Sequence, residues 1–276
     1  MSQPPEAPPQ QADFSLDNWY HTLDLGDGLV SNGYWDHRTI VDCYGIPESL
    51  AGKTALDVGT ADGFWAFEME RRGADRVVAI DVETHADFDW LPGRMPPSAP
   101  QHRMKANFEI AHARFGSSVE HRTCNVYDLS PETVGQFDIV FCGSLLLHLM
   151  NPLKALVNIR SVVKEVAIIE SLAEPGLDAI PDVPLLRFGH SDSETVPGEG
   201  GIYWRFGRRA LEEMLTYAGF ARVEIMPPCR MPPNDMEAIA IHGYPEQPAP
   251  PAPPADGRAP LLRRMLRSRR RRRQET

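Results

Sequence analysis

Acidic residues and glycines gather in one short segment, Leu56-Asp-Val-Gly-Thr-Ala-Asp-Gly-Phe-Trp65, which includes the end of a short apolar run. Gly59 and Gly63 allow the backbone to turn sharply and to approach a ligand closely. Asp57 stands beside this turn. A second acid, Asp81, lies 22 residues after Gly59 at the end of the next apolar run, where a carboxylate can accept hydrogen bonds from both hydroxyls of a ribose. This spacing predicts a site for a ligand that contains a nucleoside.

The acid at position 57 discriminates between two kinds of nucleoside ligand. A dinucleotide-binding turn has a similar glycine pattern, but Ala61 stands here in place of its middle glycine. A carboxylate ahead of the turn would also repel a pyrophosphate, whereas it counters the positive charge of S-adenosylmethionine. We therefore expect the protein to bind S-adenosylmethionine and not NAD.

Methyl transfer from this cofactor to a hydroxyl group requires a base, for which His148 is the preferred candidate and His21 the second. An alcohol does not lose its proton unaided at pH 7, and a neutral imidazole is a suitable acceptor. His148 follows Cys142, the last residue of an expected strand, by six positions, which predicts that it lies beside the reacting methyl group. A buried histidine bonded to a backbone carbonyl would fit the same pattern. His21 lies in an aromatic cluster with Trp19 and Tyr20, which predicts either a lid over the cofactor or core packing.

An acidic run follows the second apolar run and contains Asp81, Glu83, His85, Asp87 and Asp89. Such oxygen ligands suit Mg²⁺. No His-Glu-x-x-His or comparable ligand spacing occurs, however, and an acidic loop is usually solvated. We therefore expect a site without a metal, and Mg²⁺ is the less favoured alternative.

The elements that must position these residues alternate between short apolar strands and helices. Strands are expected at residues 54–58, 76–80, 119–124, 137–142, 166–169, 221–226 and 236–242, and helices at 63–72, 104–115, 152–163 and 207–218. This alternation predicts a mainly parallel sheet covered by helices on both faces. Ligands in such sheets bind beyond the carboxyl ends of the strands.

The order of these segments resembles that of the class I S-adenosylmethionine-dependent methyltransferases over about residues 50–243. The matching pieces are Asp57-Val-Gly59, Asp81, Cys124-Asn-Val126, Phe137-Asp-Ile-Val140 and Ala218-Gly-Phe220. The resemblance implies an α/β, Rossmann-like fold with a mainly parallel seven-stranded sheet. Further stretches resemble a bacterial subgroup that is similar to tRNA wobble-uridine (5-oxyacetate-type) modifying enzymes and includes small-molecule and sugar O-methyltransferases; they are Trp19-Tyr-His-Thr22, Gly63-Phe-Trp-Ala-Phe-Glu68, Leu147-His148 and Tyr203-Trp204.

The resemblance also implies roles for individual residues. Asp57, Gly59 and Gly63 would hold the methionine end of the cofactor, and Asp81 the ribose. Val82 would flank the adenine, the Val126 amide would meet its ring, and Asn125 would accept from its amino group, unless Asn125 is simply a turn residue. The full set expected to bind the cofactor is Tyr20, Asp57, Gly59, Thr60, Gly63, Asp81, Val82, Asn125, Val126 and Gly143.

The expected substrate pocket lies after the fifth strand of the fold, where Tyr203, Trp204 and Arg205 follow an irregular stretch. Aromatic faces there would stack on a sugar or another ring. The equally open interpretation is an aromatic cluster that caps the core.

The charge distribution bears on the class of substrate. The chain of 276 residues has a net charge of −10, but residues 256–276 contain nine arginines and two acids, so residues 1–255 carry 19 basic and 36 acidic side chains, a net charge of −17. Such a body repels a polyanion unless a basic patch is focused on one face. Nucleic acid is therefore the less expected partner. For the Arg-rich tail two interpretations stay open, contact with anionic lipid or RNA and a solvated tail that aids solubility.

Composition also sets expectations about compartment and domain boundaries. The four cysteines are far apart, which favours neither a zinc site nor a disulfide framework. The sequence shows neither a membrane-spanning segment nor a secretory signal. We therefore expect a cytoplasmic protein. We expect a disordered arm at 1–12 and a methyltransferase domain at 13–244, with a lid at 13–48 and a substrate insertion at about 171–206. A disordered Pro-rich linker and Arg-rich tail follow at 245–276.

The leading hypothesis is O-methylation of a hydroxyl group on a small molecule or a sugar precursor, with a histidine base. The alternative is a tRNA wobble-uridine methyltransferase, and a third possibility from another class is a catalytically silent protein that binds the cofactor and a partner. No particular oligomeric state is predicted.

Overall fold

The structure is a computed structural model that describes residues 15–95, 103–180, 182–189, 201–232 and 235–246. The expectations about an arm at 1–12 and about a linker and tail from residue 247 onward concern segments outside these described residues.

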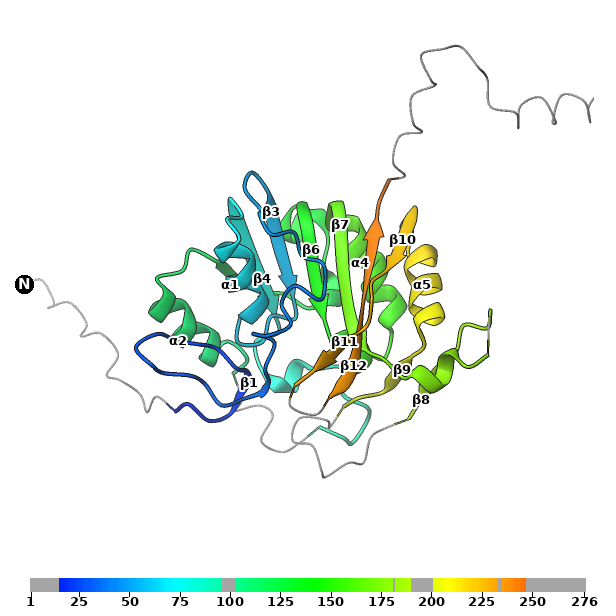
Figure 1. The fold of residues 1–276 in the computed structure, drawn as a ribbon, viewed down its shortest axis with the longest axis horizontal. Helices are drawn as coiled ribbons and strands as arrows, with labels where there is room; N and C mark the ends of the chain where they lie inside the picture. The colour runs from blue at the N-terminus through cyan, green and yellow to red at the C-terminus, as the bar shows by residue number, and fades with distance from the viewer. Residues whose placement is uncertain (1–14, 96–102, 181, 190–200, 233–234, 247–276) are drawn as a thin grey trace, which may run out of the picture. The chain divides into compact units, whose positions relative to one another are not determined.

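A central β-sheet is the main feature of the described chain (Figure 1). Seven strands lie in the order β10-β12-β7-β6-β3-β4-β5, and β11 pairs with β12. Their bounds are β3 Thr54–Val58, β4 Arg76–Asp81, β5 Glu120–Thr123, β6 Phe137–Gly143, β7 Val163–Leu172, β10 Arg222–Ile225, β11 Cys229–Met231 and β12 Met236–Tyr244. Strands β3 to β7 pair in parallel, while β12 is antiparallel to its three neighbours. The mainly parallel sheet is confirmed, and β11 is an eighth strand that the sequence did not predict.

Five α-helices belong to the described chain. They are α1 Phe64–Arg71, α2 Ala106–Phe115, α3 Pro131–Val134, α4 Pro152–Val162 and α5 Arg208–Tyr217. Local sequence explains where these helices begin and end. Ahead of α4, the Asn151 side chain accepts a hydrogen bond from the Lys154 amide. Helix α2 ends at Gly116, which has a φ of 58°. The four longer helices lie within two residues of the expected ranges.

The sheet order reverses between β3 and β6, and this reversal decides where helices and ligands lie. From β3 the chain passes through α1 to β4 on one side, and from β6 it passes through α4 to β7 on the other. Because parallel crossovers are right-handed, opposite directions of progression put α1 and α4 on opposite faces of the sheet. The Trp65 ring of α1 packs on Phe141 of β6, with ring centroids 4.6 Å apart. The carboxyl ends of β3 and β6 therefore form the switch point at which ligands bind in such sheets.

Residues 15–48, called the N-terminal arm from here on, are attached to the sheet in a way the sequence did not predict. The arm contains a small parallel pair of strands, β1 Trp19–His21 and β2 Gly33–Trp35. Cys43 forms a disulfide with Cys229 of β11, 186 positions away, with the two Cα atoms 5.9 Å apart. The sequence did not favour a disulfide, and this one differs from that expectation because separation along the chain says nothing about distance once the sheet has formed. The spacing of the cysteines therefore no longer supports the expectation of a cytoplasmic protein.

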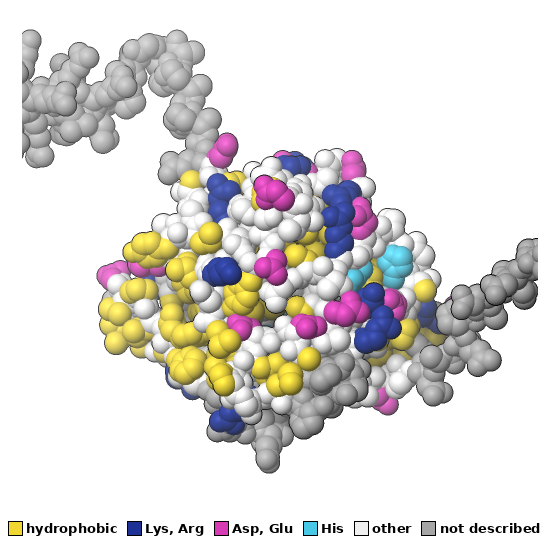
Figure 2. Space-filling view, turned by 180° about the vertical axis from the view of Figure 1, so that it is seen from behind, with side chains coloured by type: hydrophobic (Ala, Val, Ile, Leu, Met, Phe, Trp, Pro, Cys, Tyr) yellow, Lys and Arg dark blue, Asp and Glu magenta, His cyan; other side chains and the backbone are white. Residues whose placement is uncertain are grey.

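The irregular segment after β7 forms a separate hairpin beside the sheet. Here β8 Leu186–Phe188 pairs antiparallel with β9 Trp204–Phe206, and a short 3₁₀ turn, Pro175–Asp178, precedes them. Figure 2, the view from behind, shows hydrophobic side chains gathered on the side of α5 and this segment. The exposed apolar side chains of the segment are Ile180, Val183, Leu186 and Phe188.

None of the helices that the structure describes is long and apolar enough to cross a membrane.

Candidate functional site

A cavity of about 640 Å³ opens at the switch point, between the carboxyl ends of the strands and the N-terminal arm. This volume is in the range of small-molecule and cofactor sites. Ten of the fifteen residues expected to act as base, bind the cofactor or contact the substrate line it: Tyr20, His21, Asp57, Gly59, Asp81, Val82, Asn125, Val126, Gly143 and His148. Five others do not: Thr60, Gly63, Tyr203, Trp204 and Arg205.

Asp57 is held at the end of β3 by the turn that follows it. One carboxylate oxygen accepts from the Thr60 hydroxyl at 2.6 Å and from the Ala66 amide at 3.1 Å. Burial raises the pKa of Asp57 to about 6, although the Thr60 hydrogen bond acts in the opposite direction. Thr60 therefore lies behind the wall and orients Asp57. Gly59 has φ 76°, and an added Cβ would lie 3.2 Å from the Leu145 side chain, so a side chain there would narrow the cavity.

Asp81, at the end of β4, fastens the same turn from the neighbouring strand. Its two oxygens accept from the amides of Ala61 and Val82, each at 2.8 Å. Burial raises the pKa of this carboxyl to about 6, against the effect of these two hydrogen bonds. Since a carboxylate oxygen accepts more than one hydrogen bond, both oxygens can still meet a pair of ribose hydroxyls.

Asn125 and Gly63 both have roles in the fold: Asn125 caps a turn, and Gly63 allows two helices to pack closely. The side-chain oxygen of Asn125 accepts from the Tyr127 amide at 2.9 Å and caps the 3₁₀ turn Val126–Asp128. The turn interpretation of Asn125 is thus seen directly, while its place in the cavity wall keeps the second lone pair available. Gly63 precedes α1 with φ 92°, and an added Cβ would come within 2.6 Å of Phe67 and Phe108. Gly63 is needed for packing between α1 and α2.

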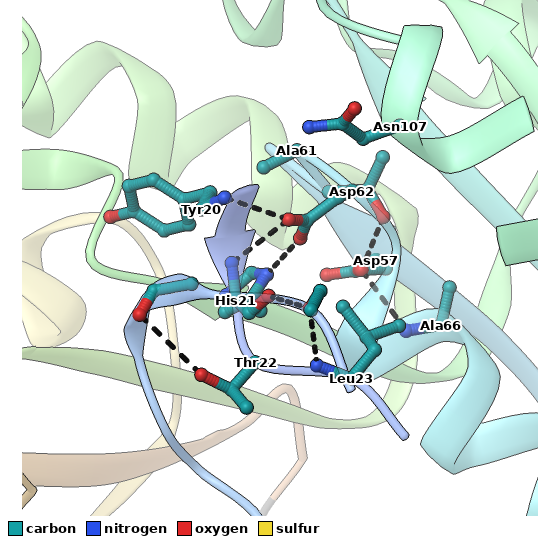
Figure 3. Close-up of polar contacts among 12 residues, drawn as sticks. Tyr20, His21, Thr22, Leu23, Asp57, Ala61, Asp62, Ala66 and Asn107 are labelled. Carbon is teal, nitrogen blue, oxygen red and sulfur yellow. Dashed lines mark hydrogen bonds and ion pairs between the residues drawn. The ribbon is translucent and has the colours of Figure 1, made fainter. Parts of the chain in front are cut away.

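His21 is paired with a carboxylate that the sequence analysis missed (Figure 3). Asp62 is only 2% exposed, and one of its carboxylate oxygens is hydrogen-bonded to Nδ1 of His21. The other oxygen accepts hydrogen bonds from the backbone amides of Tyr20 and His21, both at 2.8 Å. Because a carboxylate only accepts, Nδ1 is the donor of this hydrogen bond, and in the neutral imidazole Nε2 is then the nitrogen with the free lone pair. The pair therefore has the arrangement of a general base with an orienting carboxylate. Because Asp62 and His21 are 41 positions apart, no local sequence pattern indicates that they pair.

His148 also lines the cavity, but its environment differs. Its Nδ1 lies 3.2 Å from the Gly201 carbonyl oxygen, so this nitrogen is the donor. Burial lowers the pKa of His148 to about 4, while the hydrogen bond to Gly201 acts in the opposite direction. His148 is thus neutral at pH 7 and a weak base, and its bond to a backbone carbonyl is the one expected of a structural histidine.

The three residues expected to contact the substrate lie outside the cavity wall. The Tyr203 hydroxyl donates to the Asp89 carbonyl at 2.9 Å and accepts from the Leu91 amide at 3.1 Å. The Trp204 indole donates to the Leu149 carbonyl at 2.8 Å, and Arg205 follows on the same short strand, where its charge helps to lower the pKa of His148. The Tyr203 and Trp204 side chains thus stabilise two loops whose residues Asp89 and Leu149 line the cavity.

The acidic run after β4 is engaged in hydrogen bonds within the protein. Asp87 accepts from the Thr84 amide and hydroxyl, at 2.9 and 2.8 Å, and Asp89 from the Tyr127 hydroxyl and the Met150 amide, both at 2.6 Å. In the part of the chain that the structure describes, no group of three or more His, Cys, Asp or Glu side chains could hold a metal ion.

Comparison with known proteins identifies a family. A family model described as "Methyltransferase domain" matches residues 42–225. The ubiquinone biosynthesis O-methyltransferases of Acinetobacter baumannii (strain AYE) and Acinetobacter baylyi are 32% and 34% identical to this chain over 115 residues, which is 42% of this chain and 41% of each relative. The match thus spans about two fifths of the length of these relatives.

The fold is shared with solved structures at low sequence identity. The N-terminal domain of EvdMO1 with SAH bound superposes with a TM-score of 0.57 at 17% identity, over 83% of this chain and 92% of that one. The same domain in the presence of SAH and D-fucose gives a TM-score of 0.54 at 16% identity, with the same coverage.

Proposed function

The chain belongs to the methyltransferase-domain family, and we propose that it is an S-adenosylmethionine-dependent methyltransferase that acts on a hydroxyl group of a small molecule. The observation that carries the proposal is the cavity at the switch point, where two buried carboxyl groups, Asp57 and Asp81, end adjacent strands. No Lys or Arg is among the described residues that line it. Buried acids without a cationic side chain beside them fit a cationic ligand that also carries a ribose.

The residues of the wall divide between the parts of this cofactor. Asp57 and Gly59 would hold its methionine end, Asp81 would bind the ribose hydroxyls, and Val82, Asn125 and Val126 would surround the adenine. When bound, the cofactor supplies a methyl group that is electrophilic because its sulfur is positively charged. The task of the protein is then to orient the acceptor hydroxyl and to take its proton.

His21 is the stronger of the two candidate bases. Asp62 fixes its tautomer with Nε2 unprotonated and stabilises the positive charge that forms when Nε2 takes a proton. His148 is held at a pKa of about 4, so at pH 7 it accepts a proton far less readily. We assign proton removal to His21 and a second, orienting contact with the acceptor to His148.

The charges of the wall favour an uncharged small acceptor over RNA. Of the described residues that line the cavity, five are acids: Asp57, Asp62, Asp81, Asp87 and Asp89. This field would repel the phosphates of a nucleic acid. O-methylation is further supported by the names of the relatives from Acinetobacter. Sugar hydroxyls stay within the proposed acceptor class.

The test begins with calorimetry of the full chain with S-adenosylmethionine, S-adenosylhomocysteine and NAD. Methyl-labelled cofactor is then used to screen phenols, uncharged sugars and bulk tRNA as acceptors. The proposal expects binding of the first two ligands, none of NAD, and label in a phenol or sugar. Label in tRNA alone would replace it by the RNA-modifying alternative, and binding without transfer to any acceptor would favour the silent cofactor-binding protein.

The role of His21 is tested with the acceptor that the screen identifies. His21→Asn should lower kcat by about 10²–10⁴-fold, the usual contribution of a general base, with the Kd for S-adenosylmethionine changed less than threefold. His148→Asn is the matched comparison. It should lower kcat less than His21→Asn does and raise the KM for the acceptor more. If His148→Asn shows the larger loss of kcat, the two roles must be exchanged.

A further inference from the structure

A buried carboxyl group lies on the other side of the switch point from Asp57 and Asp81. Glu170 is near the carboxyl end of β7 and is 2% exposed. Its Oε2 accepts from the Ser144 hydroxyl at 2.8 Å, whereas its Oε1 has no hydrogen-bond partner among the described residues. Burying a carboxylate without full hydrogen bonding or a counter-charge is costly. The protonation state of such a group therefore responds to any charge that a ligand brings close to it.

Glu170 stands directly behind the cavity wall. Gly143 and Ser144 line the cavity, and Gly143 is the register partner of Glu170 across the β6–β7 pair. A Cβ added to Gly143 would lie 3.3 Å from Glu170 Oε2. Gly143 and Ser144 are thus in contact with both the cavity and Glu170.

Ser144 is fixed to Glu170 at two points. Its amide donates to the Glu170 carbonyl at 3.0 Å, in addition to the bond from its hydroxyl. Its φ is 47°, a left-handed conformation that is uncommon for residues other than glycine. The paired hydrogen bonds hold Ser144 in this conformation, with its hydroxyl between the carboxyl group and the cavity.

Among the described residues Glu170 has no lysine or arginine partner. Burial raises the pKa of Glu170 to about 7, against the effects of the Ser144 hydrogen bonds and of the charge of His21, which both act to lower it. A positive charge on the proposed cofactor would act in the same direction as that of His21. In the described part of the chain, the residues that line the cavity include neither Lys nor Arg. S-adenosylmethionine brings a positive sulfur that its product, S-adenosylhomocysteine, lacks. A nearby positive charge favours the ionised carboxylate, and its loss favours the protonated acid.

We propose that Glu170, acting through Ser144, is the ionisable group that matches the charge of the cofactor: it releases its proton when S-adenosylmethionine binds and takes up a proton when S-adenosylhomocysteine occupies the site. The inference rests on the proposed function. The protons balance over one turnover, because Glu170 returns to its starting state and the proton of the acceptor hydroxyl leaves through His21 to solvent. The carbon–sulfur bond that breaks is replaced by the carbon–oxygen bond that forms.

Other titratable groups act on Glu170 or respond to its charge. They are Tyr20 and His21 of β1, Tyr44 of the arm and Cys142 of β6. Burial, together with the charge of Glu170, raises the pKa of Tyr20, Tyr44 and Cys142 above their ordinary values, so these three stay protonated at pH 7. His21 is the remaining neighbour and is included in the test for that reason.

Calorimetry at pH 7, in buffers of different ionisation enthalpy, measures the protons released on binding by the full chain. The wild type should release about half a proton more with S-adenosylmethionine than with S-adenosylhomocysteine, because a carboxyl with a pKa near 7 is half protonated at that pH. Glu170→Gln should abolish this difference. The matched control is Glu165→Gln, an exposed acid on the same strand, which should keep it.

Two further measurements do not depend on proton counts. At pH 8, Glu170→Gln should weaken S-adenosylmethionine about tenfold and leave S-adenosylhomocysteine unchanged, since an opposite charge within a few ångströms shifts a pKa by at least about one unit. If this variant does not fold, carboxyl carbon NMR of the wild type replaces it. One glutamate should titrate near pH 7 with S-adenosylhomocysteine and at least about one unit lower with S-adenosylmethionine.

The results that overturn the inference are distinct from those that overturn the proposed function. An undiminished proton difference in Glu170→Gln, or its loss in His21→Gln alone, would show that Glu170 is not the group involved. Identical glutamate titrations in the two NMR complexes would show the same. Failure of the wild type to bind either ligand would instead remove the proposed function itself.

Discussion

Replacing Glu170 by glutamine should change how the stability of the ligand-free protein depends on pH. The pKa of this carboxyl is raised by burial from 4.5 to about 7. The folded state therefore holds the proton more tightly than the unfolded state. Such a group contributes stability below its unfolded pKa and loses that contribution as pH rises through the folded pKa. Glutamine never ionises and can still accept from Ser144, so the variant avoids this loss.

The size of the effect follows from the two pKa values. With values of 4.5 and about 7, ionisation of Glu170 lowers the free energy of unfolding by about 1 kcal/mol at pH 5 and about 3 kcal/mol at pH 8. The free energy of unfolding of Glu170→Gln, relative to that of the wild type, should therefore rise by about 2 kcal/mol between pH 5 and pH 8. Other buried groups, such as His37 and His148, titrate alike in both proteins and cancel in this comparison.

Urea unfolding at pH 5, 6, 7 and 8, followed by fluorescence, measures this difference. Glu165→Gln serves as the control on the same strand, because its carboxylate is exposed and pairs with Lys53 at the surface. Its stability relative to the wild type should change by less than about 0.5 kcal/mol over this range. The same flat dependence for Glu170→Gln would refute the conclusion that Glu170 is buried as an acid without a counter-charge.

Three further predictions test the disulfide, the cofactor end of the site and the chain boundaries. Cys43→Ser should lower the free energy of unfolding by about 2–5 kcal/mol, because the Cys43–Cys229 bond closes a loop of 186 residues; equal urea midpoints for oxidised wild type and variant would argue against the bond. The affinity for S-adenosylmethionine, measured by calorimetry, should fall as pH drops below about 6, where Asp57 takes up a proton, and Asp57→Asn should remove at least part of this dependence. A chain shortened to residues 12–244 should keep a cooperative thermal transition close to that of the full chain, since the removed ends are rich in Pro, Gln and Arg; a broad transition would contradict this.

Much of the architecture was determined by local sequence. The strands β3, β4 and β6 are short apolar runs, and the four longer helices show apolar spacing or clear end signals, so each could be placed within about two residues. In a parallel sheet the carboxyl ends of neighbouring strands share one edge. For that reason the positions of Asp57 and Asp81 along the chain were enough to predict that both would lie at one cavity.

Only the tertiary structure decided which side chains far apart in the sequence form pairs. Asp62 is hydrogen-bonded to His21, 41 positions away, and Ser144 to Glu170, 26 positions away. Cys43 forms a disulfide with Cys229, 186 positions away. The position of Tyr203 and Trp204 after the fifth strand predicted contact with the substrate, but it could not predict their hydrogen bonds to the Asp89 and Leu149 carbonyl groups. Periodicity reports which face of its own element a residue occupies. It carries no information about how loops cross or which distant groups meet, because those contacts form only when separate elements pack together.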